Sequence, residues 1–138
     1  MTFEVMIQDI CSDLGIDPPK IQPRRKMSTP TTLAECSSDG QTVYIRHDAV
    51  LTPDTAFALA HELRHVWQIR TDRERWMGSY VPSAGATSKD EYNRQPAEID
   101  AHAYGLIYMR TLGIEILFNN LSEDVKELIR TRATEIKR

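Results

Sequence analysis

Cysteine, basic charge and long apolar runs are all scarce in this sequence, and each scarcity excludes a class of protein. The two cysteines, Cys11 and Cys36, stand far apart with no partner at metal-site spacing, so we expect reduced thiols rather than a disulfide framework. No apolar run approaches the length of a membrane span. A net charge of -3 lacks the basic excess typical of nucleic-acid-binding proteins. We therefore expect neither a membrane nor a nucleic acid as partner.

The first residues also lack the basic start and long apolar stretch of a secretory signal, since Glu4 and Asp9 fall among them. This predicts a cytoplasmic location. With 138 residues, 41% of them apolar, the chain is large enough to form one ordinary domain with its own core. We expect a single domain over residues 1–138, and the sequence carries no signal for a particular oligomeric state.

Apolar residues at spacings of three and four predict four helices. The expected helices span residues 2–15, about 52–70, about 93–112, and 122 to near the C-terminus. Gly15 is suited to end the first helix, and Thr52 followed by Pro53 is suited to start the second. The last helix has an expected buried stripe of Val125, Leu128, Ile129 and Ile136.

Two short β-prone runs, Thr31–Cys36 and Thr42–Arg46, flank a turn-rich segment and predict a hairpin. Pro23 and Pro30 permit only short or edge strands between them. Residues 72–92 have no sustained periodicity and predict a long loop, with Trp76 and Tyr80 as candidate substrate contacts. The expected fold class is α+β, with a small, mostly antiparallel sheet of about three strands.

The most informative motif is His61-Glu62-Leu63-Arg64-His65, within the second expected helix. Two histidines four residues apart lie on one helix face, where both imidazoles can bind one zinc ion. Glu62, beside the first histidine, can reach a zinc-bound water. Leu59, Leu63 and Val66 fall on another side of this helix, which can pack on the sheet. The motif predicts metal-assisted hydrolysis.

A catalytic zinc needs a third protein ligand, and the helix after Asn93 offers Glu98, Asp100 and His102. Glu98 and His102 share a face with two small residues, Ala101 and Gly105, which permit close approach of another helix. Asp100 points about 200° away from Glu98. This favours Glu98 as the ligand and His102 as its neighbour or a proton donor, while His102 or Asp100 as the ligand stays an alternative.

The two motifs together, His61–His65 and Pro96-Ala97-Glu98-Ile99-Asp100-Ala101, resemble the gluzincin group of zinc metallopeptidases, particularly its small single-domain bacterial and phage forms. The resemblance implies a minimal zincin-like domain with one zinc ion held by His61, His65 and Glu98. It also implies that Glu62 is the general base. One departure is His102, which stands where large gluzincins often have an aspartate.

The resemblance further implies that the strand before the metal helix, Thr42–Arg46, is the cleft edge that holds an extended peptide. The expected activity is zinc-dependent hydrolysis of a peptide or protein substrate. Candidate donors to the oxyanion are His102, Tyr104, Tyr108, Tyr92, and arginine or tyrosine residues of the 72–92 segment.

Two alternatives keep the zinc ion without constitutive peptidase activity. One is a zincin-like regulatory module that binds a partner. The other is a latent peptidase, blocked by its own 72–92 segment or C-terminal helix.

Overall fold

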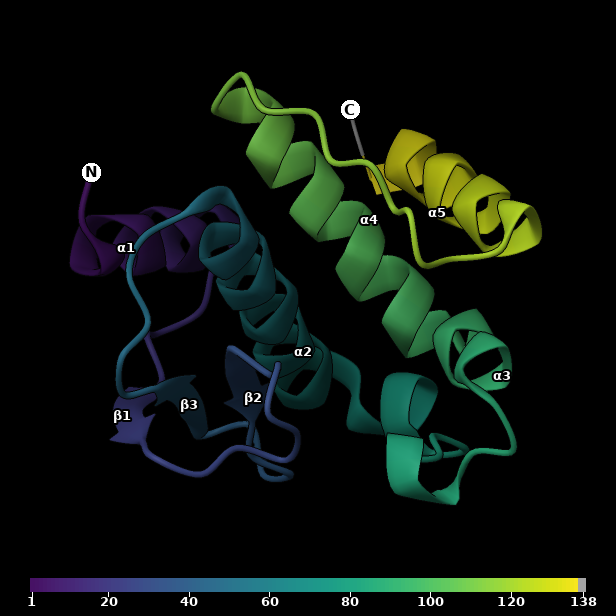
Figure 1. Cartoon of the computed structure of the whole chain (residues 1–138), viewed down its shortest axis with the longest axis horizontal. Helices are drawn as coiled ribbons and strands as arrows, with labels where there is room; N and C mark the ends of the chain where they lie inside the picture. The colour runs from purple at the N-terminus through teal and green to yellow at the C-terminus, as the bar shows by residue number, and fades with distance from the viewer. Residues whose placement is uncertain (137–138) are drawn as a thin grey trace.

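A computed structural model describes residues 1–136, and within them it shows an α+β fold (Figure 1). In chain order the elements are α1 (Phe3–Leu14), β1 (Lys20–Arg24), β2 (Ala34–Cys36), β3 (Thr42–Arg46), α2 (Pro53–Met77), a 3-10 turn (Ser83–Gly85), α3 (Lys89–Arg94), α4 (Pro96–Thr111) and α5 (Glu123–Ile136). The predicted fold class is confirmed. In this part of the chain no helix combines the length and the apolar character needed to cross a bilayer.

The helix ends follow the local signals in the sequence. The Thr2 hydroxyl accepts a hydrogen bond from the Val5 amide at 3.2 Å, and Gly15 ends α1 with a left-handed φ of 69°. In α5, Val125 and Ile129 are fully buried as predicted, but Leu128 is 43% exposed. The predicted stripe was wrong there because Ala133, four residues after Ile129, continues the buried face instead.

The sheet has the strand order β1-β3-β2 and is mixed rather than mostly antiparallel. β2 and β3 form the predicted antiparallel hairpin, whereas β1 pairs with β3 in parallel over five residues. Pro23 lies in β1, which is one edge of the sheet, as its missing amide hydrogen requires. β3 is therefore the central strand, and β2 is the other edge.

α2 is longer than predicted, because it continues past Arg70 to Met77 across a kink at Asp72. Asp72 leaves the helical conformation, with φ -157° and ψ 74°, and its carboxylate accepts a hydrogen bond from the Arg75 amide at 3.2 Å. The helix thus restarts with Asp72 as its cap. The predicted 72–92 loop was wrong at both ends, since 73–77 belong to α2 and Lys89–Arg94 form α3.

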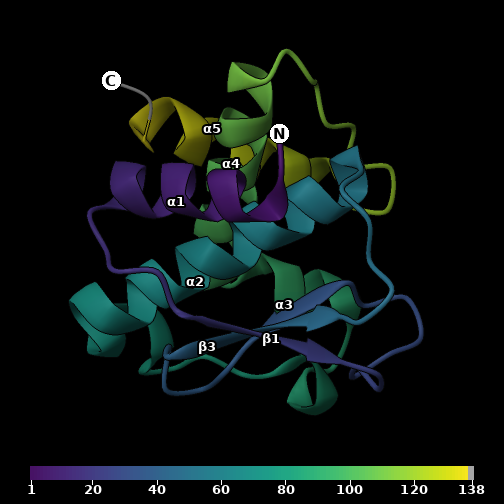
Figure 2. The same cartoon turned by 90° about the vertical axis from the view of Figure 1, so that its left-hand side faces the viewer.

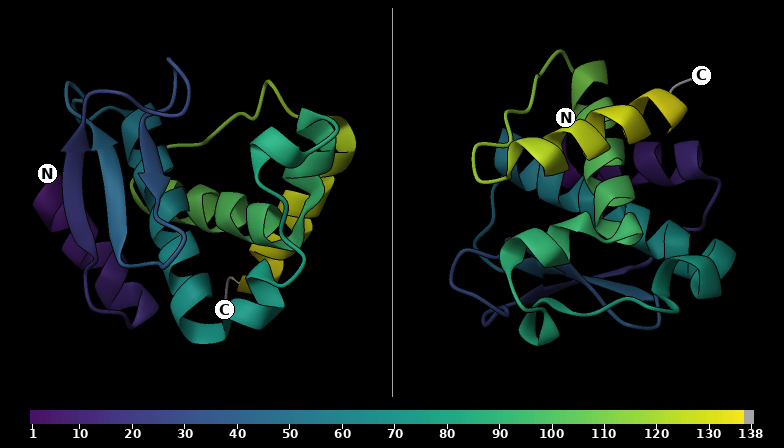
Figure 3. Two further views of the ribbon diagram at one scale, coloured as in Figure 1. Left: turned by 90° about the horizontal axis from the view of Figure 1, so that it is seen from below. Right: turned by 90° about the vertical axis from the view of Figure 1, so that its right-hand side faces the viewer.

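The helices and the sheet form layers around α2 and α4. α1 and the sheet lie on opposite sides of α2, and α4 lies between α2 and α5 (Figures 2 and 3). α4 is buried nearly all round, as expected for a helix with neighbours on two sides. Gly105 permits the contact with α2, since a Cβ atom there would lie 2.6 Å from the Phe57 ring. The predicted role of this small residue in close helix approach is confirmed.

Candidate metal centre

Three side chains from α2 and α4, those of His61, His65 and Glu98, converge at one point. The Nε2 atoms of His61 and His65 are 3.2 Å apart. The Glu98 carboxylate places Oε1 3.2 Å from His61 Nε2 and Oε2 3.0 Å from His65 Nε2. All three side chains are buried. The structure therefore brings together the three residues that the sequence singled out as ligands.

The spacing of these donors fits a tetrahedral zinc site. Zinc binds imidazole nitrogen and carboxylate oxygen at about 2.0–2.1 Å, so two ligands of a tetrahedral ion lie about 3.3 Å apart. The three separations in this triad are 3.0–3.2 Å, with Glu98 Oε1 facing His61 and Oε2 facing His65. Two imidazoles and one carboxylate are also the ligand types of a catalytic rather than a structural zinc site.

The charges of the triad suit a divalent cation. Burial alone would raise the pKa of Glu98, but the neighbouring His65 and His61 outweigh it and hold that pKa well below its usual range. Burial likewise opposes protonation of His65, yet Glu98 raises the pKa of that imidazole to about 9. The triad therefore holds an ionised carboxylate against protonated imidazole, and a metal ion binds by displacing such protons.

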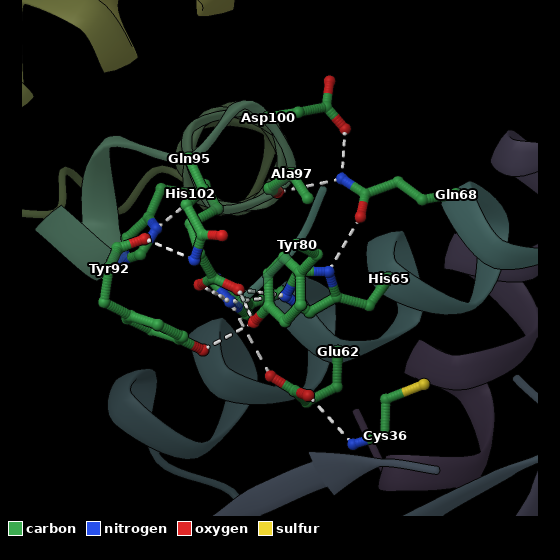
Figure 4. Close-up of polar contacts among 12 residues, drawn as sticks. Cys36, Glu62, His65, Gln68, Tyr80, Tyr92, Gln95, Ala97, Asp100 and His102 are labelled. Carbon is green, nitrogen blue, oxygen red and sulfur yellow. Dashed lines mark hydrogen bonds and ion pairs between the residues drawn. The ribbon is translucent and has the colours of Figure 1, made fainter. Parts of the chain in front are cut away.

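Glu62 lies beside the triad, with Oε2 3.7 Å from His61 Nε2. Its other oxygen, Oε1, accepts a hydrogen bond from the Cys36 amide at 2.9 Å (Figure 4). Burial raises the pKa of Glu62 above its usual value. The backbone of β2 thus fixes the orientation of this carboxylate.

The strand beside the site is β2, not β3, so the predicted role of Thr42–Arg46 as cleft edge is wrong. β3 is paired on both sides and has no free edge. Leu33 and Ser37 direct their main-chain groups to β3, because the Leu33 carbonyl accepts from Arg46 and the Ser37 amide donates to Thr42. Because main-chain groups alternate in direction along a strand, the N–H and C=O groups of Ala34 and Cys36 point away from β3, toward the open edge of the sheet. There the Cys36 amide donates to Glu62.

Tyr80 reaches the triad from the segment after α2. Its hydroxyl donates to Glu98 Oε2 at 2.7 Å and lies 2.8 Å from the Tyr92 hydroxyl (Figure 4). Burial, followed by the negative charge of Glu98, raises the pKa of both phenols, so both stay protonated. The Gln95 side chain holds this segment through two hydrogen bonds. Its oxygen accepts from the Val81 amide at 2.6 Å, and its nitrogen donates to the Val81 carbonyl at 2.8 Å.

His102 and Asp100, the alternative ligands, occupy different positions. His102 lies near His61 and Glu98, and its Nδ1–H donates to the Glu98 carbonyl at 2.7 Å. Burial lowers the pKa of His102 to about 4, which keeps it neutral. Asp100 points away from the triad and binds Arg64 through two hydrogen bonds, at 2.7 and 3.0 Å. The Asp100 alternative is therefore excluded by its geometry.

Tyr104 and Tyr108 do not reach the site, so their prediction as candidate hydrogen-bond donors to the oxyanion is wrong. The Tyr104 hydroxyl donates to Asp13 at 2.8 Å, and the Tyr108 hydroxyl donates to Asp9 at 3.4 Å. Both rings belong to the core between α4 and α1. They lie four residues apart on a helix face that differs from that of Glu98, so they anchor α1 instead.

Sequence reasoning missed Gln68 and Gln95. Gln68 is fully buried beside His65, and Gln95 holds the Tyr80 segment. Gln68 lies within α2 and Gln95 lies between α3 and α4, and at neither position does the local sequence distinguish the glutamine from an exposed one. Comparisons of the chain with protein-family models, curated proteins and solved structures give no match.

Proposed function

We propose that this protein is a zinc-dependent peptide hydrolase that acts on a peptide or protein substrate. The observation that carries the proposal is the triad of His61, His65 and Glu98, with donor separations of 3.0–3.2 Å and Glu62 adjacent. One zinc ion per chain would be held by the triad. The likeness of the two motifs to gluzincins supports the same activity, and a cytoplasmic location is part of the proposal.

The chemistry that zinc supplies at such a site is acidification of a water molecule, to a pKa of about 7, and polarisation of the scissile carbonyl. Glu62 takes the proton of the attacking water and passes it to the leaving amine. Its carboxylate is suited to this role because one oxygen is held by the Cys36 amide while the other faces His61.

The open edge of β2 is suited to bind the substrate backbone. The free main-chain groups of Ala34 and the carbonyl of Cys36 lie on the side of the strand that faces Glu62. An extended peptide that pairs with this edge would pass its carbonyl groups close to the triad. Tyr80, whose neighbour Val81 is held by Gln95, supplies a hydroxyl donor for the developing oxyanion.

The test is the variant Glu62→Gln, compared with wild type for zinc content and for cleavage of a peptide library with and without chelator. We expect one zinc per chain in both proteins and a loss of about 10²–10⁴-fold in hydrolysis in the variant, because the general base is gone. Chelation should abolish cleavage by wild type.

Glu74→Gln is the matched control, since Glu74 is an exposed glutamate on the same helix. It should keep both zinc and activity. Full activity in Glu62→Gln, or wild type that binds no zinc, would contradict the proposal.

A second candidate is a latent hydrolase, and the hydrogen bond from Tyr80 to Glu98 favours it. The Tyr80 hydroxyl occupies one carboxylate oxygen of the triad at 2.7 Å. α5 packs on the face of α4 that carries Ile99, Ala103 and Leu106, so the Tyr80 segment is the better candidate for the blocking element. A regulatory module that binds zinc and a partner would share this arrangement.

Tyr80→Phe separates the two candidates. If Tyr80 stabilises the oxyanion, kcat should fall by about 10²–10³-fold with KM little changed. If Tyr80 blocks the site, the variant should be more active than wild type. Steady-state kinetics on a cleaved library peptide give the answer, with Tyr44→Phe in β3 as the control.

A further inference from the structure

Gln68 is a fully buried polar side chain at the junction of α2 and α4, one helical turn from the triad. Its amide makes three hydrogen bonds (Figure 4). The Nε2 group donates to the Ala97 carbonyl at 2.9 Å and to Asp100 Oδ2 at 2.8 Å, and Oε1 lies 2.8 Å from His65 Nδ1. Every polar atom of this side chain is thus engaged.

The orientation of this amide is determined by its partners. A backbone carbonyl and an ionised carboxylate only accept hydrogen bonds, so the atom that faces Ala97 and Asp100 must be the NH₂ group. The oxygen of Gln68 therefore faces His65, and because that oxygen only accepts, Nδ1 of His65 must carry the hydrogen. Nε2 of His65 is consequently the atom directed at Glu98 and His61.

Asp100 is held rigidly in the position that orients Gln68. Arg64 binds its two oxygens at 2.7 and 3.0 Å, and Arg132 of α5 donates to Oδ1 at 2.8 Å. The Arg64 guanidinium stacks on Trp67, with its carbon 3.8 Å from the ring centroid. Three hydrogen bonds from two arginines therefore meet the Asp100 oxygens, which act as acceptors toward them and toward the Gln68 amide.

We infer that Gln68, anchored by Asp100, is the positioning residue that fixes His65 with Nδ1 protonated and Nε2 free to bind the metal. The inference rests on the proposed zinc site. Metal-binding histidines commonly donate their second ring N–H to a carboxylate or carbonyl, which fixes the ring and raises its basicity. Here Gln68 stands between the carboxylate and the ring: it donates to Asp100 and accepts from His65. Arg132 connects the same carboxylate to α5.

The variant Gln68→Met tests this inference, because methionine keeps the length of the side chain and removes its polar atoms. Zinc affinity is measured by competition with a chromophoric chelator. We expect a dissociation constant about 10–100-fold larger than in wild type. Gln22→Met makes the same change at an exposed position and should bind zinc as wild type does.

Gln68→Glu separates positioning from packing. Its carboxylate still accepts from His65 Nδ1–H but repels Asp100, so zinc affinity should recover relative to Gln68→Met while the melting temperature stays below that of wild type. A variant Gln68→Met that binds zinc as tightly as wild type overturns the inference alone. Wild type that binds no zinc overturns the proposed function and, with it, this role of Gln68.

Nitrogen-detected NMR of the His65 ring decides the case if Gln68→Met does not fold. In zinc-loaded wild type, Nδ1 of His65 should carry a slowly exchanging proton. An unprotonated Nδ1 would overturn the inference without any variant.

Discussion

α4 presents two contrasting faces, one to α2 and one to α5. The face toward α2 carries Glu98 and Gly105 and packs against histidines, an arginine and a glutamine. The face toward α5 carries Ile99, Ala103 and Leu106 and packs against Val125, Ile129 and Ala133. Both faces are buried to a similar degree, but only the second is apolar throughout.

The two faces of α4 differ in what their burial contributes to the free energy of folding. Burying an apolar side chain such as Ile129 stabilises the fold by about 1.5–3 kcal/mol. Burying ionised groups such as Glu98 costs desolvation energy that their partners only partly return. Under the proposed function, the face toward α2 is retained for its chemistry, and the face toward α5 contributes stability that offsets the cost of burying those charged groups.

The largest effect should follow from Glu98→Ala on the functional face. Removal of a metal ligand should reduce zinc affinity by more than the roughly 100-fold that loss of an outer hydrogen bond can cause. The free energy of unfolding of the metal-free protein should change less than in Ile129→Ala, because the desolvation cost of the carboxylate also disappears. Elemental analysis and urea unfolding measure the two quantities.

Glu91→Ala, an exposed glutamate of α3, is the control and should leave zinc content unchanged. Retention of full zinc by Glu98→Ala would show that Glu98 is not the third ligand. His102, which lies near His61, would then be the residue to test.

Ile129→Ala should have the next largest effect, on the stabilising face. Ile129 has no exposed surface, so its truncation should cost about 2–5 kcal/mol in the free energy of unfolding. Zinc stoichiometry of the folded variant should stay at the wild-type value. The neighbouring Leu128 is 43% exposed, and Leu128→Ala should cost far less. If Ile129→Ala and Leu128→Ala lowered the free energy of unfolding equally, burial against α4 would not be the source of the stability assigned to this face.

Gly105→Ala should have the smallest effect and tests how closely α2 approaches α4. The added methyl group would lie 2.6 Å from the Phe57 ring, an overpacking that costs about 1–3 kcal/mol. The higher helix propensity of alanine offsets up to about 1 kcal/mol of this destabilisation. The cost should shrink in a Phe57→Leu background, and a double-mutant cycle by urea unfolding measures that coupling. If the two substitutions changed the free energy of unfolding additively, the contact between residue 105 and Phe57 would not limit how closely α2 approaches α4.

The convergence of His61, His65 and Glu98 could be predicted from the sequence because it depends on helical periodicity. His61 and His65 are four residues apart, and Glu98 shares its face with Ala101 and Gly105. These are local relations that need no knowledge of the rest of the fold. The same holds for Gly15 and Thr2 at the ends of α1.

Contacts between distant residues could not be predicted in this way. Tyr80 reaches Glu98 because α2 restarts at Asp72 and because Gln95 holds Val81 across fourteen residues of chain. The strand order also escapes local patterns, since alternation indicates which residues share a face but not which strand is central. The family resemblance implied that β3 is the cleft edge, whereas the pairing makes β3 central and leaves β2 as the edge strand beside Glu62.

Pro23 has a consequence for how the sheet meets other chains. The Lys20 amide and the Arg24 carbonyl face β3, so alternation directs the main-chain nitrogen of Pro23 outward, where it has no hydrogen to donate. That interruption discourages a second copy of the protein from extending the sheet at β1, a common route to aggregation. The two edges of the sheet therefore differ. The β1 edge is interrupted by Pro23, whereas the β2 edge beside Glu62 can pair with an added strand.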